Sequence, residues 1–289
     1  MIAYNPKDWY KLILSFHKSD TFRMLLPAII GMAVFSTLFV YLGLEVWKLH
    51  YKSTIAVHSI LGFVISMLLV FRTNTAYDRW WEGRKLWGGF VTGSRIFSMK
   101  LSAFAPQPET RVVQALLTNY FISCKDHLRR EMSTKQWVEI PGKSVDLYTN
   151  ASHIPNAILA DLIRELVALQ KCGVISEMQL LMLNDELRGF ADNLGACERI
   201  RATPIPYSYS MFIKKIVFFY TITIPFGLLT DYGYWTVLVT SFVFYAFASL
   251  ELLAEEIEDP FGREPNDLPT DEIAEGIRKQ INSIFGEEK

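Results

Sequence analysis

The sequence has almost no net charge, few cysteines and no catalytic signature. Its 29 Lys and Arg residues balance 30 Asp and Glu residues to a formal charge of −1, so the whole chain carries no electrostatic signal for nucleic acid. The three cysteines, Cys124, Cys172 and Cys197, are odd in number and lack CxxC spacing, which indicates reduced thiols without a disulfide or zinc role. No Ser-His-Asp order, glycine-rich phosphate loop or zinc-ligand spacing is found. We therefore predict that the protein is not an enzyme.

Charged residues are also missing from four long stretches. Between Thr54 and Phe71 the only ionisable residue is His58, and about 20 apolar residues at a helical rise suffice to cross a bilayer. The sequence therefore predicts four membrane-spanning helices, of which the third is short unless residues 210–213 contribute. The other three uncharged runs are Met24–Leu44, Ile216–Thr230 and Tyr232–Leu250.

Basic residues flank these runs unevenly. Arg23, Arg72, Lys214 and Lys215 all stand at one side of the predicted spans, whereas residues 230–234 contain no lysine or arginine. Because lysine and arginine concentrate in cytoplasmic loops, we expect both termini and the large middle region to be cytoplasmic.

Strand-like alternation is almost absent, so the chain is predicted to be all-α. Three amphipathic helices are expected in the middle region: one through Val112 to Leu128, one between Pro155 and Gly173, and one that begins at Ser176 with a capping box to Gln179. We divide the chain into an N-terminal amphipathic cytosolic helix (1–22), the first two spans (23–88), a cytosolic helical region (89–209), the last two spans (210–252) and a cytosolic tail (253–289).

Three motifs in this order resemble the bacterial branch of the bestrophin family. They are FRTNTAYDRWWEGRKLWG after the second span, GACERIRATPIPYSY before the third and EEIEDPFGREPNDLP after the fourth. The resemblance implies a homopentameric ion channel with four spanning helices per subunit, whose helical cytosolic region extends the pore. It also implies that the second span lines the pore with three hydrophobic rings that form a neck.

The resemblance places the neck rings at Phe63, Met67 and Phe71. Their four-residue steps put them on one face of a helix, and narrow apolar pores can gate by dewetting. Viewed alone, such a stripe is more often a lipid-facing or packing surface. The flexible thioether of Met67 should make the middle ring softer.

A second constriction of the family lies at the cytosolic end of the pore, on the helix before GACERI. The resemblance places it at Met178, with Leu181, one turn further on, as the alternative if the register is shifted. A buried core methionine is an equally good explanation of Met178.

The acidic tail contains candidate metal ligands. By resemblance to the calcium clasp of eukaryotic members, Asp259, Glu264 and Asp267 are weak candidates for Ca²⁺, which prefers carboxylate oxygens. Arg263 and Pro265 interrupt the acidic run, so we expect chiefly a brace between subunits, and no other cofactor. On the sequence pattern alone, such an acidic run is more often a solvated helix end that a proline stops.

The leading hypothesis is thus a passive channel for small inorganic ions in the bacterial inner membrane, with copies of itself and membrane lipids as partners. The sign of the permeant ion does not follow from an apolar neck. The alternative is a membrane scaffold or sensor that acts through its cytosolic helices without conducting ions. A secondary transporter is disfavoured because the four spans show no inverted repeats.

Overall fold

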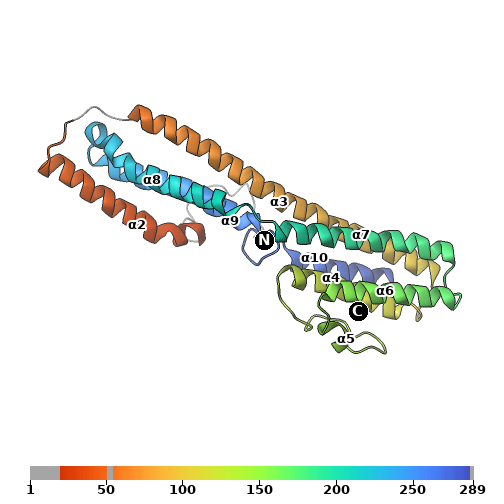
Figure 1. Cartoon of the computed structure of the whole chain (residues 1–289). Helices are drawn as coiled ribbons and strands as arrows, with labels where there is room; N and C mark the ends of the chain where they lie inside the picture. The colour runs from red at the N-terminus through yellow and green to blue at the C-terminus, as the bar shows by residue number, and fades with distance from the viewer. Residues whose placement is uncertain (1–19, 51–54, 287–289) are drawn as a thin grey trace. The chain divides into compact units, whose positions relative to one another are not determined.

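The computed structural model describes residues 20–50 and 55–286. The amphipathic helix expected over residues 1–22 lies outside the described residues, apart from its last three positions. Within the described ranges every regular element is a helix and no strand occurs, which confirms the all-α prediction for this part of the chain. The elements are α2 (Asp20–Tyr41), the π-helix η2 (Leu42–Val46), α3 (Ile55–Phe104), α4 (Arg111–Leu128), α5 (Asp146–Thr149), α6 (Ile154–Lys171), α7 (Glu177–Ala202), α8 (Tyr207–Tyr232), α9 (Trp235–Glu258) and α10 (Thr270–Ile284) (Figure 1).

The described chain divides into two compact units. One contains the residues up to Arg79 together with Pro204–Glu258, and we call it the apolar unit; the other contains Trp80–Thr203 and the residues from Asp259 onward, and we call it the polar unit. Helix α3 contributes its first half to the apolar unit and its second half to the polar unit, and it continues past Gly88 without a break.

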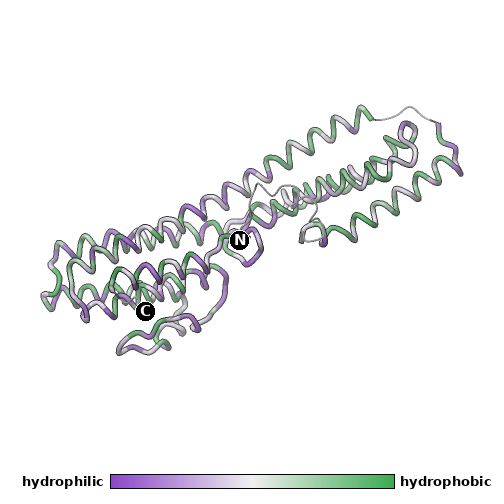
Figure 2. The backbone as a smooth tube through the Cα atoms, turned by 180° about the vertical axis from the view of Figure 1, so that it is seen from behind, coloured by the Kyte–Doolittle hydropathy of each residue, from purple (hydrophilic) through white to green (hydrophobic). Residues whose placement is uncertain are grey.

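Four helices are long and apolar enough to cross a membrane: α2 with η2, α3, α8 and α9. Apolar residues predominate along α2, the first half of α3, α8 and α9, whereas apolar and polar residues are mixed along the polar unit (Figure 2). Helix α8 begins at Tyr207, directly after Pro206, so residues 210–213 do contribute to the third span and its 26 residues are long enough.

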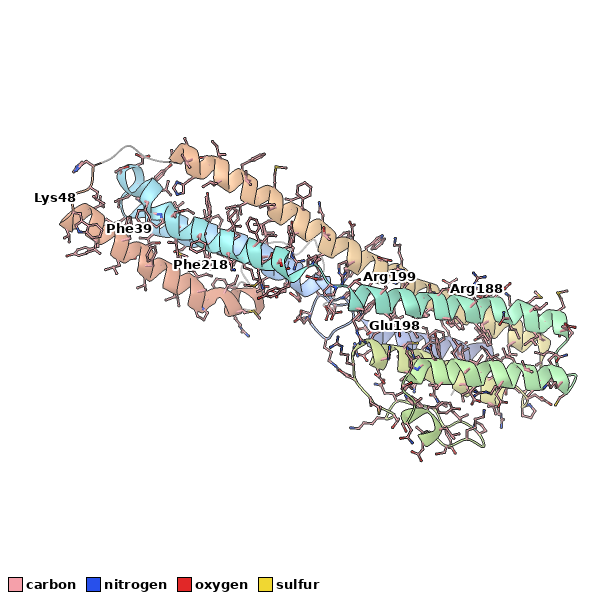
Figure 3. The ribbon with its side chains drawn as sticks, viewed as in Figure 1. Phe39, Lys48, Arg188, Glu198, Arg199 and Phe218 are labelled. Carbon is pink, nitrogen blue, oxygen red and sulfur yellow. The ribbon has the colours of Figure 1, made fainter. Side chains whose placement is uncertain are left out.

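Aromatic and aliphatic contacts hold the apolar unit together. Phe39 of α2 (labelled in Figure 3) packs on Phe226 of α8 with ring centroids 4.0 Å apart. Ile65 and Leu69 of α3 form a buried cluster with two residues of α8, Ile213 and Val217. One face of α3 is therefore committed to packing within its own chain.

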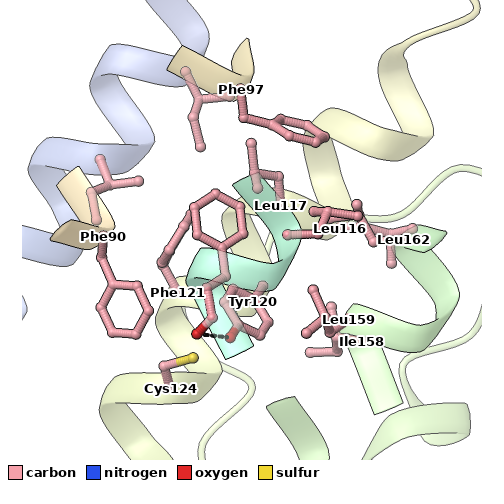
Figure 4. Close-up of a cluster of buried hydrophobic side chains, with 14 of the residues drawn as sticks. Phe90, Phe97, Leu116, Leu117, Tyr120, Phe121, Cys124, Ile158, Leu159 and Leu162 are labelled. Atoms are coloured by element: carbon pink, nitrogen blue, oxygen red, sulfur yellow. Dashed lines mark hydrogen bonds between the residues drawn. The ribbon is translucent and has the colours of Figure 1, made fainter. Parts of the chain in front are cut away.

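The polar unit has a conventional buried core. Phe90 and Phe97 of α3 meet aromatic residues of α4 and leucines of α6 (Figure 4), and the Tyr120 hydroxyl donates to the carbonyl oxygen of Phe190 at 3.1 Å. Cys124 and Cys197 are buried here, and burial raises the pKa of the Cys197 thiol to about 12. All three cysteines are free of disulfide bonds within the chain.

Helices α3 and α7 run antiparallel at short range. A Cβ atom on Gly89 would lie 2.6 Å from the Asn193 side chain, and one on Gly93 would lie 2.9 Å from the Phe190 ring. A side chain at either position would have to displace Asn193 or Phe190, so glycine suits this close approach of the two helices. Lys100, two turns further along α3, bonds to the carbonyl oxygen of Met182 and to the Glu186 carboxylate.

The three helices predicted for residues 112–202 are present, and their capping signals are confirmed. Ser176 and Gln179 make both bonds of the capping box at α7, with distances of 2.8 and 3.3 Å. Gly173, just beyond α6, has a φ of 72°, the left-handed conformation of a helix C-terminus.

Candidate functional site: the exposed face of helix α3

The proposed neck residues lie on the unpacked side of α3. Phe63, Met67 and Phe71 are 66%, 44% and 56% exposed in the single chain. At about 100° per residue they point roughly opposite to Ile65 and Leu69, which are buried against α8. The three apolar side chains are thus free to face either a pore or lipid.

A buried ion cluster fixes α3 directly after Phe71. Arg72 is 1% exposed, and its Nη2 atom lies 2.6 Å from Oε2 of Glu258 on α9. Its Nε atom lies 3.6 Å from the Glu251 carboxylate, and Oε1 of Glu258 accepts the backbone N–H of Ile205 at 2.6 Å. These contacts set which side of α3 faces its own chain.

His58, the one ionisable residue within the second run, makes a helix contact. Its Nε2 atom lies 3.0 Å from the carbonyl oxygen of Thr223, and its own carbonyl accepts the Tyr220 hydroxyl at 3.1 Å. A carbonyl oxygen can only accept, so Nε2 carries the proton. The imidazole therefore joins α3 to α8.

The cytosolic aperture candidates are exposed at the start of α7. Met178 is 67% exposed and Leu181 is 55% exposed, so neither contributes to the core of its own chain. The interpretation of Met178 as a buried core methionine is wrong for the single chain. Which of the two residues faces a pore stays a prediction.

The acidic candidates of the tail are not brought together as a metal site. Asp267 is buried and its Oδ2 atom accepts the backbone N–H of Glu264 at 2.7 Å, whereas Asp259 is exposed. Among the described residues, one group of three potential ligands has its ligand atoms within 4.8 Å of one another, and it contains none of these three. The expectation about calcium stays a prediction.

That group, His127, His153 and Glu198, was missed by the sequence reasoning. The three residues come from the end of α4, the N-cap of α6 and the last turns of α7. They are separated by 26 and 45 positions in the chain, so no local spacing links them. The one local signal was a histidine directly before Ile154-Pro155, where a helix begins.

Comparison with known proteins places this arrangement in a family. The family model described as Bacterial/Fungal Bestrophin protein matches residues 1–283. The chain belongs to this bestrophin family.

Several bestrophin relatives carry functional names. The voltage-dependent anion channel-forming protein YneE of Escherichia coli O157:H7 is 35% identical over 286 residues, which cover 96% of this chain and 91% of the relative. The voltage-dependent anion channel-forming protein alr2987 of Nostoc is 34% identical over 230 residues, or 77% of this chain and 75% of the relative. The crystal structure of a bestrophin homologue from Klebsiella pneumoniae matches with a TM-score of 0.83 and 28% identity, and covers 92% of this chain and all of that one.

This bestrophin is a membrane protein with four apolar helices. The names of its relatives describe channel-forming proteins and not enzymes, which agrees with the prediction from the sequence.

Proposed function

We propose that this bestrophin is a homopentameric channel that conducts small inorganic anions passively across the bacterial inner membrane. The observation that carries the proposal is the exposure of Phe63, Met67 and Phe71 on the face of α3 opposite to its packed face. Five copies of this face around an axis would stack three apolar rings into a neck. The names of the curated relatives support an anion as the permeant ion.

The exposed apolar residues of the polar unit support an assembly of several copies. Met178 and Leu181 at the start of α7 are exposed, as are Ile96 and Met99 on the second half of α3. The bonds from Lys100 to Met182 and Glu186 bring these two stretches close to each other. An exposed apolar patch outside a membrane marks an interaction surface, and a neighbouring copy or a pore lining would use it. In this proposal the polar unit is cytoplasmic and Met178, or Leu181, forms a second constriction.

The proposed mechanism places gating and selectivity in different parts of the pore. An apolar neck narrow enough to lose its water blocks ions without a charged plug, and it opens when it widens and fills with water. Since these three side chains carry no charge, preference for anions would arise in the wider parts of the pore. The unbranched Met67 side chain makes the middle ring the most adaptable of the three.

Single-channel recording in planar bilayers under a salt gradient tests the proposal. We expect the wild type to conduct current with a reversal potential near the equilibrium potential of the anion. Met67→Ala should show larger conductance or a higher open probability. Leu238→Ala, which shortens an exposed apolar residue of α9, is the control and should change neither quantity. A reversal potential near the equilibrium potential of the cation would overturn the anion assignment. No current from a confirmed pentamer would favour a scaffold.

A further inference from the structure

Two imidazoles in the polar unit converge on one carboxylate oxygen. Nε2 of His127 and Nε2 of His153 each lie 2.7 Å from Oε1 of Glu198, and the two rings are 4.4 Å apart. Glu198 lies near the C-terminal end of α7 (Figure 3), and all three side chains are partly buried. We propose that these residues form a binding site for a zinc-class divalent cation.

The donor set suits such an ion. Two imidazole nitrogens and one carboxylate oxygen are borderline ligands that Zn²⁺ accepts, and three protein ligands leave one coordination position open. The neutral imidazole is the form that coordinates a metal.

The three ligands are held by a rigid frame. His127 is in the last turn of α4, and α4, α6 and α7 share the aromatic and leucine core of the polar unit. His153 is the N-cap residue of α6, so the start of that helix places its ring next to His127. Pre-positioned ligands avoid the cost of ordering separate segments when the ion binds.

Only a small rearrangement is needed to admit the ion. In a tetrahedral zinc site with bonds of about 2.0–2.2 Å, neighbouring ligand atoms are about 3.3 Å apart. The observed 2.7 Å separations are those of hydrogen bonds, in which both imidazoles donate Nε2–H to Glu198. Zinc would take the place of these two protons, and each ring would carry its proton on Nδ1 instead. For His153 this change gives up the cap bond that its Nδ1 atom accepts from the backbone N–H of Asn156 at 3.2 Å.

Solvent reaches one side of the site. A cavity of about 270 Å³ is lined by His127 together with Arg201 and Ser152, so water can approach the site from the side of His127. Arg201 also lines this cavity, and its guanidinium donates to the carbonyl oxygen of His127 at 2.5 Å.

The test is zinc titration of the full-length protein in detergent, after removal of metals with EDTA. Cys172→Ser serves as the background, because Cys172 is an exposed thiol that could bind zinc by itself. We expect one zinc per chain by calorimetry. Co²⁺ should give a visible absorption band that zinc abolishes.

Two variants isolate the ligands while preserving the fold. His153→Asn keeps a side-chain oxygen that can cap α6 but removes the imidazole, and His127→Gln keeps an N–H donor to Glu198. Even outer-shell substitutions cost about 10–100-fold in metal affinity, so each variant should lose at least that much. His50→Asn, at an exposed histidine outside the cluster, is the matched control and should bind as the wild type does.

The proposal would be overturned if the wild type took up no zinc. It would also be overturned if both ligand variants bound zinc as tightly as the wild type does. The three residues would then form a hydrogen-bond network that only joins α4, α6 and α7.

Discussion

Arg72 and Glu258 form a buried ion pair one residue beyond the proposed neck. The guanidinium Nη2 lies 2.6 Å from Oε2 of the carboxylate, and the other carboxylate oxygen accepts the N–H of Ile205. One side chain of α9 thereby holds α3 and the segment that leads into α8. Because Arg72 follows Phe71 directly, this pair sets the rotation of the helix that carries Phe63, Met67 and Phe71.

Replacing Arg72 should destabilise the apolar unit strongly. Arg72→Met leaves the carboxylates of Glu251 and Glu258 without their positive partner, and breaking a buried pair in this way costs about 3–5 kcal/mol. The exposed pair between Lys214 and Glu255 provides the control, because Lys214→Met should cost about 0–1 kcal/mol. Thermal unfolding in detergent, followed by tryptophan fluorescence, measures both. Equal shifts in the two variants would contradict the structural role of Arg72.

A charge placed at Met67 should change ion selectivity if this side chain lines the pore. Met67→Lys should move the reversal potential toward the equilibrium potential of the anion, and Met67→Glu should move it toward that of the cation. The reason is that a ring of charges in a pore selects ions of the opposite sign. Met67→Gln is polar but uncharged, so it should increase conductance and leave the reversal potential unchanged. A Met67 that faces lipid would give no such opposite shifts.

The sequence predicted the features that depend on local spacing. Four-residue steps placed Phe63, Met67 and Phe71 on one face, and the capping box of Ser176 located the start of α7. The partners of Arg72 could not be predicted, because Glu251 and Glu258 meet it only after α9 has packed on α3. The cluster of His127, His153 and Glu198 could not be predicted for the same reason, because its members lie far apart in the chain.

The contacts of the polar loop between α4 and α6 could not be predicted from the sequence either. Asn119 of α4 bonds to both backbone groups of Val138 at 2.7 Å, and Lys143 pairs with Asp161 of α6 at 2.5 Å. Such bonds from a loop to a helix follow no periodic pattern. Only the folded chain shows that the loop is fixed at these two points.

Gly227 should not tolerate a side chain. A Cβ atom at this position of α8 would lie 2.7 Å from Nδ1 of His58, so Gly227→Ala would push the ring away and disturb its bond to Thr223. Gly31→Ala is the matched control in α2, where the added carbon meets nothing within 4 Å beyond its chain neighbours and its own helix backbone. Alanine there should be neutral or stabilise by up to about 1 kcal/mol. The unfolding temperature of Gly227→Ala should therefore fall below that of the wild type. The unfolding temperature of Gly31→Ala should stay the same or rise. A stable Gly227→Ala variant would show that α3 and α8 do not need this close approach.

Asp161 should make the stability of the polar unit depend on pH. Burial alone would raise the pKa of its carboxyl, but hydrogen bonds from Lys143 and Tyr148 outweigh burial and lower the pKa. In the unfolded chain the carboxyl titrates at about 3.9, so the unfolded state takes up a proton first as the pH falls. The stabilisation is complete above that pH and is lost as the pH falls through the lower pKa of the folded state.

Asp161→Asn removes this charge and tests the sign of the effect. At pH 7 the variant should unfold at a lower temperature than the wild type, and the difference should shrink as the pH falls below about 3.9, where the unfolded carboxyl takes up its proton. Asp192→Asn is the control, because Asp192 forms only an exposed pair with Arg188 (Figure 3) at 3.6 Å and such pairs contribute little. A difference between wild type and Asp161→Asn that stays constant down to pH 3 would mean that the carboxyl acts by its shape and hydrogen bonds rather than by its charge.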